Sequence, residues 1–412
     1  MGPINHIVLV FQAISALASP TNAFSQKPTT GGAMSQLTHL AQAAYAQAKQ
    51  QAASPDLQKH DGNICSWKDV KVRREWGDLS KAERTEYINA VKCFQSTPPR
   101  YSQTIVPGAR SRYDDFLATH INQTQTIHST GNFLGWHRYY TWLYEQALHE
   151  ECGYTGTQPY WDWALTAETG LHASPIFDGT ATSMSGDGVP IPNQQPIALL
   201  GDPSQNLPPI MLPSGTGGGC IATGPFANLT VNMGPVELDA PGGIHKSANL
   251  SAPGGVFAYN PRCVKRDLTD EINRKYSSAA LTLSNILDTK NIDEFQTLMQ
   301  GAPANAIGIH GGGHYSLGGD PGRDVFASPG DPAFYLLHGN IDRVWWIWQM
   351  LDPQQRVYGE DAVMGTRTFM NNPPSENATL DDWVEYGEAA GPRRKLRELM
   401  STQSGPFCYV YL

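Results

Sequence analysis

The chain has 412 residues, of which 16% are charged and 40% are hydrophobic, and its formal net charge at pH 7 is −9. This composition predicts a globular core and excludes a disordered chain. The sequence contains no basic stripe, so nucleic acids and anionic membrane surfaces are not expected partners. The 40 glycines and 30 prolines predict a loop-rich protein rather than a plain helical bundle.

The N-terminus predicts secretion. Residues 7–18 read IVLVFQAISALA, an apolar run of signal-peptide length that is followed by small residues. We therefore expect a signal peptide over about residues 1–23 and an extracellular protein. A buried N-terminal helix is the alternative, because Lys and Arg are missing before this run. Four N-x-S/T sequons support secretion and glycosylation, at Asn122, Asn228, Asn249 and Asn377.

Six cysteines are spread along the chain and form no C-x-x-C pair. An even number of cysteines in a secreted chain predicts three disulfides. Spacing favours Cys220–Cys263, and for the other four we choose Cys65–Cys408 and Cys93–Cys152 among the pairings that remain. Beyond the N-terminus no apolar run is long enough to cross a bilayer.

The first half of the chain predicts helices. Residues 34–54 are rich in Ala and Gln and predict a surface helix. Ser80 followed by Glu83 forms a capping box, after which apolar residues recur at helical spacing to residue 94. Residues 113–151 contain two further helices.

The second half begins with an irregular insertion. Residues 170–262 are dense in Gly and Pro, and Cys220 and Cys263 bracket much of this stretch. Helical periodicity returns over residues 267–300. The last long helix follows Asp331-Pro332, where Asp331 can cap it and Pro332 suits its first turn.

Six of the twelve histidines fall in two triplets of similar plan, at His120, His128 and His137, and at His310, His314 and His338. His310 and His314 are four residues apart, on one face of a helix. Three glycines separate them, and each costs a helix roughly 1 kcal/mol relative to Ala, so a metal bound by both imidazoles would offset that cost. A flexible loop with two incidental histidines is the alternative for this pair alone.

The last histidine of each triplet lies in an apolar, aromatic-rich helix. His137 is followed by Arg138, and Asp342 lies four residues after His338. A buried imidazole that binds a metal needs its other nitrogen held, so Asp342 either orients His338 or joins a buried ion pair. Four facing helices of this kind would build a metal site in a bundle core.

The donor set indicates the metal. Six neutral imidazoles, without a carboxylate or thiolate motif among them, suit a late first-row metal. We therefore expect copper, with zinc as the alternative. The H-E-x-x-H motif of many zinc hydrolases is absent from the sequence, which weakens the zinc alternative.

Several motifs together resemble a secreted fungal tyrosinase or catechol oxidase, within the type-3 dicopper polyphenol oxidases. They are RREW at 73–76, SKAERTEYINAVKC at 80–93, WHRYY around His137, PYWDW at 159–163, HGGGH at 310–314, DPAF at 331–334, HGNIDRVWWIWQ at 338–349 and CYVY at 408–411. The resemblance covers roughly residues 60–412. It divides the chain into a signal peptide (1–23), an N-terminal segment (24–59) and a catalytic domain (60–412).

This resemblance implies a mainly α fold, in which a central four-helix bundle carries a dicopper site, with long loops and few short strands. It implies oxidation of o-diphenols to o-quinones with reduction of O2 to water, and the family also includes enzymes that hydroxylate monophenols. The expected partners are thus a phenolic or catecholic molecule and O2. A hemocyanin-like oxygen carrier and a zinc-binding protein remain the alternatives.

The resemblance also assigns roles to single residues. His120, His128 and His137 would bind copper A, and His310, His314 and His338 copper B. Phe334 would pack beneath the copper pair, Val325 or Phe326 would form a gate above it, and Asp342 would support a ligand. Arg73 or Arg74 would meet Tyr409 or Tyr411.

The sequence departs from the family pattern at several positions. Thr126 stands where many fungal relatives have a cysteine, so no thioether to His128 is expected. Leu337 replaces a histidine that many relatives have before the ligand. Gly311 and Gln300 stand at or near the Asn and Glu of enzymes active on monophenols, and this favours diphenol oxidation. The chain stops at Leu412, so we expect no C-terminal domain that plugs the site.

Overall fold

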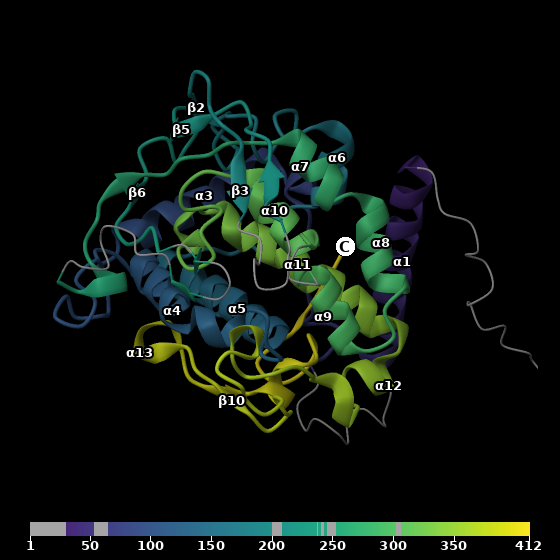
Figure 1. Ribbon diagram of the computed structural model, residues 1–412. Coiled ribbons are helices and arrows are strands. Elements are labelled where there is room, and N and C mark those ends of the chain that lie inside the picture. The colour runs from purple at the N-terminus through teal and green to yellow at the C-terminus, as the bar shows by residue number, and fades with distance from the viewer. Residues whose placement is uncertain are drawn as a thin grey trace, which may run out of the picture.

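A computed structural model describes residues 30–52, 65–199, 208–236, 238–239, 243–244, 253–301 and 306–412. Helices dominate and the strands are short, as predicted (Figure 1). The helices are α1 (Thr30–Ala52), α3 (Lys81–Ser96), α4 (Arg112–Ile127), α5 (Phe133–Cys152), α6 (Trp163–Thr169), α7 (Asp270–Tyr276), α8 (Ala279–Leu287), α9 (Ile292–Gln300), α10 (Ile309–Leu317), α11 (Ala333–Leu351), α12 (Pro353–Arg356) and α13 (Gly387–Ala390).

Four of these helices form the central bundle. Helix α11 packs against α5 and α10, and α5 packs against α4. Helix α11 is buried on all sides from Ala333 to Met350, which its continuous apolar and aromatic sequence explains. Helix α4 begins with a capping box between Ser111 and Asp114. Helices α5 and α10 thus pack directly on α11, which carries the last histidine of the second triplet, and α4 joins them through α5.

The other long helices pack around this bundle. The small residues of α1 face α8 and α11, with Ala33, Leu37 and Ala48 fully buried. Helix α3 packs on α4 and α5 and begins with the predicted capping box of Ser80 and Glu83. Helix α1 therefore packs on the body of the molecule, although it lies within the predicted N-terminal segment.

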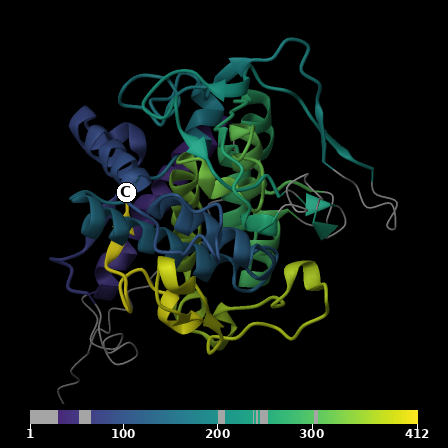
Figure 2. The ribbon, with the colours of Figure 1, turned by 90° about the vertical axis from the view of Figure 1, so that its left-hand side faces the viewer.

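Strands pair only two by two in the described chain. A parallel pair joins β1 (Lys71–Arg73) to β12 (Tyr409–Tyr411). The antiparallel pairs are β2 (Gly188–Pro190) with β5 (Gly218–Ile221), β3 (Ile197–Leu199) with β4 (Ile210–Leu212), β6 (Thr230–Val231) with β9 (Arg262–Cys263), β7 (Leu238–Asp239) with β8 (Gly243–Ile244), and β10 (Trp383–Val384) with β11 (Arg394–Lys395). The predicted insertion thus holds β2 to β9. The insertion and the C-terminal segment, defined here as residues 353–395, lie on opposite sides of the bundle in both views (Figure 1, Figure 2).

All three predicted disulfides are present: Cys65–Cys408, Cys93–Cys152 and Cys220–Cys263. The first ties the segment before β1 to β12, and the last closes much of the insertion. Three sequon asparagines are exposed, namely Asn122, Asn228 and Asn377. Asn249 and the predicted signal peptide lie outside the described residues.

The start of α11 differs in detail from the prediction. Pro332 is the N-cap residue rather than the first helical one. The Asp331 carboxylate still accepts a hydrogen bond from the Ala333 N–H (2.9 Å), so it satisfies one free donor of the helix start. The same carboxylate is held by a buried, two-pronged ion pair with Arg266 at 2.7 and 2.8 Å. Among the described helices, none has the length and apolarity needed to span a membrane.

Candidate metal centre

The bundle brings all six predicted histidines together. In each triplet the possible ligand atoms lie within 4.8 Å of one another. Helix α4 supplies His120 and, as its C-cap residue, His128, whereas α5 supplies His137. The pair His310 and His314 lies on α10, which is helical in spite of its three glycines, and His338 lies on α11. The alternative of a flexible glycine loop is wrong.

The two triplets face each other. The rings of His128 and His310 are nearly parallel, 6.1 Å apart, and those of His137 and His338 lie 4.5 Å apart. The ring of Phe334 packs against both triplets, 4.1 Å from His338 and 5.3 Å from His120 between ring centres. The structure therefore shows one centre with two halves.

Backbone carbonyls orient four of the imidazoles. The Nδ1 atoms of His120, His128, His137 and His314 lie 2.8 to 3.0 Å from the carbonyl oxygens of Phe326, Thr124, Phe133 and Gly322, respectively. A carbonyl only accepts, so each Nδ1 carries the proton and each Nε2 keeps a free lone pair. This fixed tautomer is the arrangement that metal-binding histidines use.

The other two imidazoles have buried nitrogens that find no protein partner in the part of the chain that the structure describes. These atoms are Nε2 of His310 and both ring nitrogens of His338. A buried polar atom without a partner is costly, and a metal ion would satisfy it. The residues present therefore fit a pair of metal ions.

Burial lowers the pKa of all six imidazoles. For His128 and His314 the pKa falls from 6.5 to about 4. For the other four histidines the pKa lies well below 6.5, because burial and then repulsion between neighbouring imidazolium ions both lower it. These are His120, His137, His310 and His338. At neutral pH the centre thus presents six uncharged imidazoles, the form that binds a metal.

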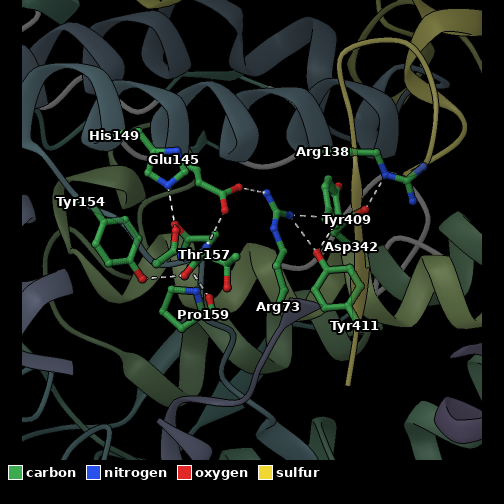
Figure 3. A network of polar contacts seen from close by, with 12 residues as sticks. Arg73, Arg138, Glu145, His149, Tyr154, Thr157, Pro159, Asp342, Tyr409 and Tyr411 are labelled. Carbon is green, nitrogen blue, oxygen red and sulfur yellow. Dashed lines mark hydrogen bonds and ion pairs between the residues drawn. The ribbon is translucent and has the colours of Figure 1, made fainter. Parts of the chain in front are cut away.

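A buried charge network adjoins the centre (Figure 3). Arg138, next to His137, donates to Asp342 Oδ1 (2.5 Å). The hydroxyls of Tyr409 and Tyr411 donate to Asp342 Oδ2, at 2.6 and 2.5 Å. Because Asp342 follows His338 by one helical turn, the network joins the two long helices of the centre to the end of the chain.

Arg73 completes this network, as the resemblance implied (Figure 3). Its guanidinium donates to the Tyr411 hydroxyl (3.1 Å) and lies over the Tyr409 ring at 3.7 Å from the ring centre. It also forms a buried ion pair with Glu145 of α5. Of the two arginines proposed for this contact, Arg74 instead pairs with Glu83 at the surface.

The α10 side is the most exposed part of the centre. His314 is the half-buried member of the six, and the others are buried. Gly311, Tyr315 and Val325 are half-buried as well, whereas Phe326 is 3% exposed and packs in a second hydrophobic cluster. Of the two predicted gate positions, Val325 is therefore the one nearer solvent.

Gln300 and Gly311 differ in what surrounds them. The Gln300 Oε1 accepts a hydrogen bond from the backbone N–H of Ser129 (2.7 Å), directly after His128. A Cβ placed on Gly311 would first meet the side chains of Ile307 at 3.3 Å and Tyr315 at 3.5 Å. A larger residue after His310 therefore needs a small shift of the Ile307 side chain.

Two histidine triplets that face each other inside a helical bundle define a type-3 dicopper protein. The donor set is imidazole alone, and the paired arrangement matches no zinc motif considered above. The structure is thus consistent with copper as the metal.

Comparisons with known proteins support the assignment to the type-3 dicopper proteins. The family model "Common central domain of tyrosinase" matches residues 110–351. Tyrosinase P of Aspergillus terreus is 45% identical over 342 residues, which are 82% of this chain and 91% of that protein. N-acetyl-6-hydroxytryptophan oxidase ivoB of Emericella nidulans is 39% identical over 362 residues, or 85% and 94% of the two chains. The solved structure of a mutant polyphenol oxidase from Thermothelomyces thermophila superposes on this chain with a TM-score of 0.82 and 41% sequence identity. The match covers 92% of this chain and 98% of that protein's chain.

The chain therefore belongs to the tyrosinase family and is an oxidoreductase with a dicopper site. This membership does not favour the oxygen-carrier or zinc alternatives.

Proposed function

We propose that the protein oxidises o-diphenols to o-quinones, with His120, His128 and His137 as ligands of copper A and His310, His314 and His338 as ligands of copper B. Two catechols each give up two electrons and two protons, and one O2 becomes two waters. The observation that carries the proposal is the pair of histidine triplets that meet around Phe334 with their Nε2 atoms free.

When bound, the two coppers supply O2 binding and two-electron oxidation. The protein supplies the geometry. The carbonyls of Phe326 and Gly322 hold His120 and His314 in the ligating tautomer. Phe334 packs against His338 and His120 and would keep that side of the centre dry. The half-burial of Val325 supports its proposed role as the gate residue.

An oxygen electrode tests the proposal. Copper-loaded protein is given 4-methylcatechol or, separately, 4-methylphenol, and O2 consumption is recorded. We expect rapid uptake with the diphenol and little with the monophenol. Metal analysis of the same sample should give two coppers per chain, and two zincs without copper would contradict the proposal.

The preference for diphenols is proposed to depend on Gly311 and Gln300. The double variant Gly311→Asn/Gln300→Glu introduces the residue pair of relatives that act on monophenols, and the flexible Ile307 side chain must shift slightly to admit the asparagine. A carboxylate at position 300 still accepts the Ser129 N–H and adds a base. We expect the ratio of monophenol to diphenol oxidation to rise by about 10-fold or more. An unchanged ratio of monophenol to diphenol oxidation in the folded variant would show that Gly311 and Gln300 do not set the preference for diphenols.

The lowered pKa values predict how the copper-free protein responds to acid. The unfolded chain binds protons on its histidines near pH 6.5, whereas folded His128 and His314 bind them only near pH 4. The unfolded state therefore holds more protons between these values, and stability falls as the pH drops from 6.5 to 4. The loss is roughly 3 kcal/mol for each of the two residues.

Thermal unfolding of copper-free protein at several pH values measures this loss. A His128→Gln/His314→Gln variant should show a flatter decline in Tm, because these two positions no longer titrate. Equal slopes for both proteins would show that other groups cause the acid sensitivity.

We also propose that the protein is secreted. Three disulfides in the described chain and the exposure of three sequon asparagines support an oxidising, extracellular setting. Glycosidase treatment of protein from the culture medium, followed by mass spectrometry, tests secretion and glycosylation together.

A further inference from the structure

One cation near the centre has no partner in the described chain. Arg323 makes no ion pair, hydrogen bond or stacking contact over an aromatic ring, whereas each of the other described arginines makes at least one. It is half-buried, so part of its water shell is already lost. A guanidinium in this state is ready to bind an anion.

The backbone fixes Arg323 close to both copper sites. The residue before it, Gly322, accepts the hydrogen bond of His314 at 2.9 Å. Three residues after it, Phe326 accepts the hydrogen bond of His120 at 2.8 Å. Arg323 therefore lies on a short segment that is tied to one ligand of each copper, with Val325 on the same segment.

Arg323 also interacts with Tyr315 on α10, the more exposed side of the centre. Burial raises the pKa of the Tyr315 hydroxyl, and the positive charge of Arg323 opposes that rise, so the two groups are within electrostatic range. Tyr315 follows His314 in α10, and its ring would lie 3.5 Å from a Cβ on Gly311. Gly311, His314, Tyr315 and Arg323 are all half-buried. These four residues are thus partly accessible to solvent, whereas five of the six histidines are buried.

The carboxylates nearest in sequence are already engaged. Asp320 forms a two-pronged ion pair with Arg262, at 2.7 and 2.8 Å. Asp324 accepts the backbone N–H groups of Val236 and Phe326, at 2.7 and 2.9 Å. Their oxygens therefore face other donors, and Arg323 keeps its hydrogen-bonding capacity for a ligand.

We propose that Arg323 binds the carboxylate of substrates that carry one, so that the enzyme prefers catechols with an acidic side chain. This inference rests on the proposed diphenol oxidation. The diol end enters towards the coppers, whereas burying a carboxylate there would be costly. The carboxylate therefore stays at the opening, where the planar guanidinium accepts it through two parallel hydrogen bonds.

Two catechols with the same reacting ring test this assignment on the copper-loaded enzyme. One is neutral 4-methylcatechol and the other is the anion 3-(3,4-dihydroxyphenyl)propionate. The measured quantity is the kcat/KM of the anion divided by that of the neutral substrate. In Arg323→Gln we expect this ratio to fall about 5- to 10-fold, and in Arg323→Lys to recover in part. The matched control Arg393→Gln removes an exposed arginine of the C-terminal segment and should keep the wild-type ratio.

A second measurement is independent of turnover. Calorimetry with 3-phenylpropionate, which has no hydroxyls to oxidise, should show weaker binding to Arg323→Gln than to the wild type. An unchanged ratio together with unchanged binding would overturn the role of Arg323 while leaving diphenol oxidation intact. If the wild type oxidised neither catechol, the proposed function would fail, and the calorimetric comparison would still decide whether Arg323 binds a carboxylate.

Discussion

Replacing His338 with alanine is expected to abolish O2 uptake with catechol, with a loss of more than about 100-fold. His338 is 1% exposed, and within the described residues neither of its ring nitrogens has a protein partner. Its ring centre lies 4.1 Å from that of Phe334 and 4.5 Å from that of His137, so this residue of the second triplet also packs against the first. Without it copper B keeps two imidazoles, which is too few to hold the metal in a fixed geometry.

Metal analysis should accompany the activity measurement. We expect the copper content of His338→Ala to fall from two ions per chain to about one, with an unchanged far-UV circular dichroism spectrum. His39→Ala is the matched control, because His39 is exposed on the surface of α1. Full activity in the double variant His310→Ala/His338→Ala would disprove the dicopper assignment.

The sequence predicted that the six histidines meet, in part because helical spacing carries that information. His310 and His314 share a face of α10 since they are one turn apart, and the bundle core is where α5 and α11 bury their apolar sides. The carbonyls of Thr124 and Phe133 also follow from spacing, because each lies four residues before the histidine it holds.

Other parts of the site depend on contacts between distant segments, which spacing does not reveal. The carbonyl of Phe326 reaches His120 across 206 residues of sequence. Arg323 has no motif that marks it, and only its lack of a partner among the described residues singles it out. Gln300 likewise shows its contact with Ser129 only once α9 and the end of α4 are placed together.

Replacing Asp342 with alanine is expected to cost about 3–5 kcal/mol of folding stability. Asp342 is 3% exposed and accepts hydrogen bonds from Arg138, Tyr409 and Tyr411. The network holds two buried arginines, Arg73 and Arg138, and two carboxylates. Alanine removes one negative charge, so a buried positive charge remains without compensation and two tyrosine hydroxyls lose their acceptor.

Denaturant unfolding with the disulfides intact measures this cost. The matched control is Asp381→Ala, whose carboxylate is exposed and pairs with Lys395 and Arg397 at the surface. Solvent screens that pair, so we expect no measurable change in the unfolding midpoint. Asp342→Ala should in addition lower copper affinity, because Arg138 and Asp342 adjoin the ligands on α5 and α11. A midpoint shift for Asp342→Ala no larger than that for Asp381→Ala would show that the network does not stabilise the fold.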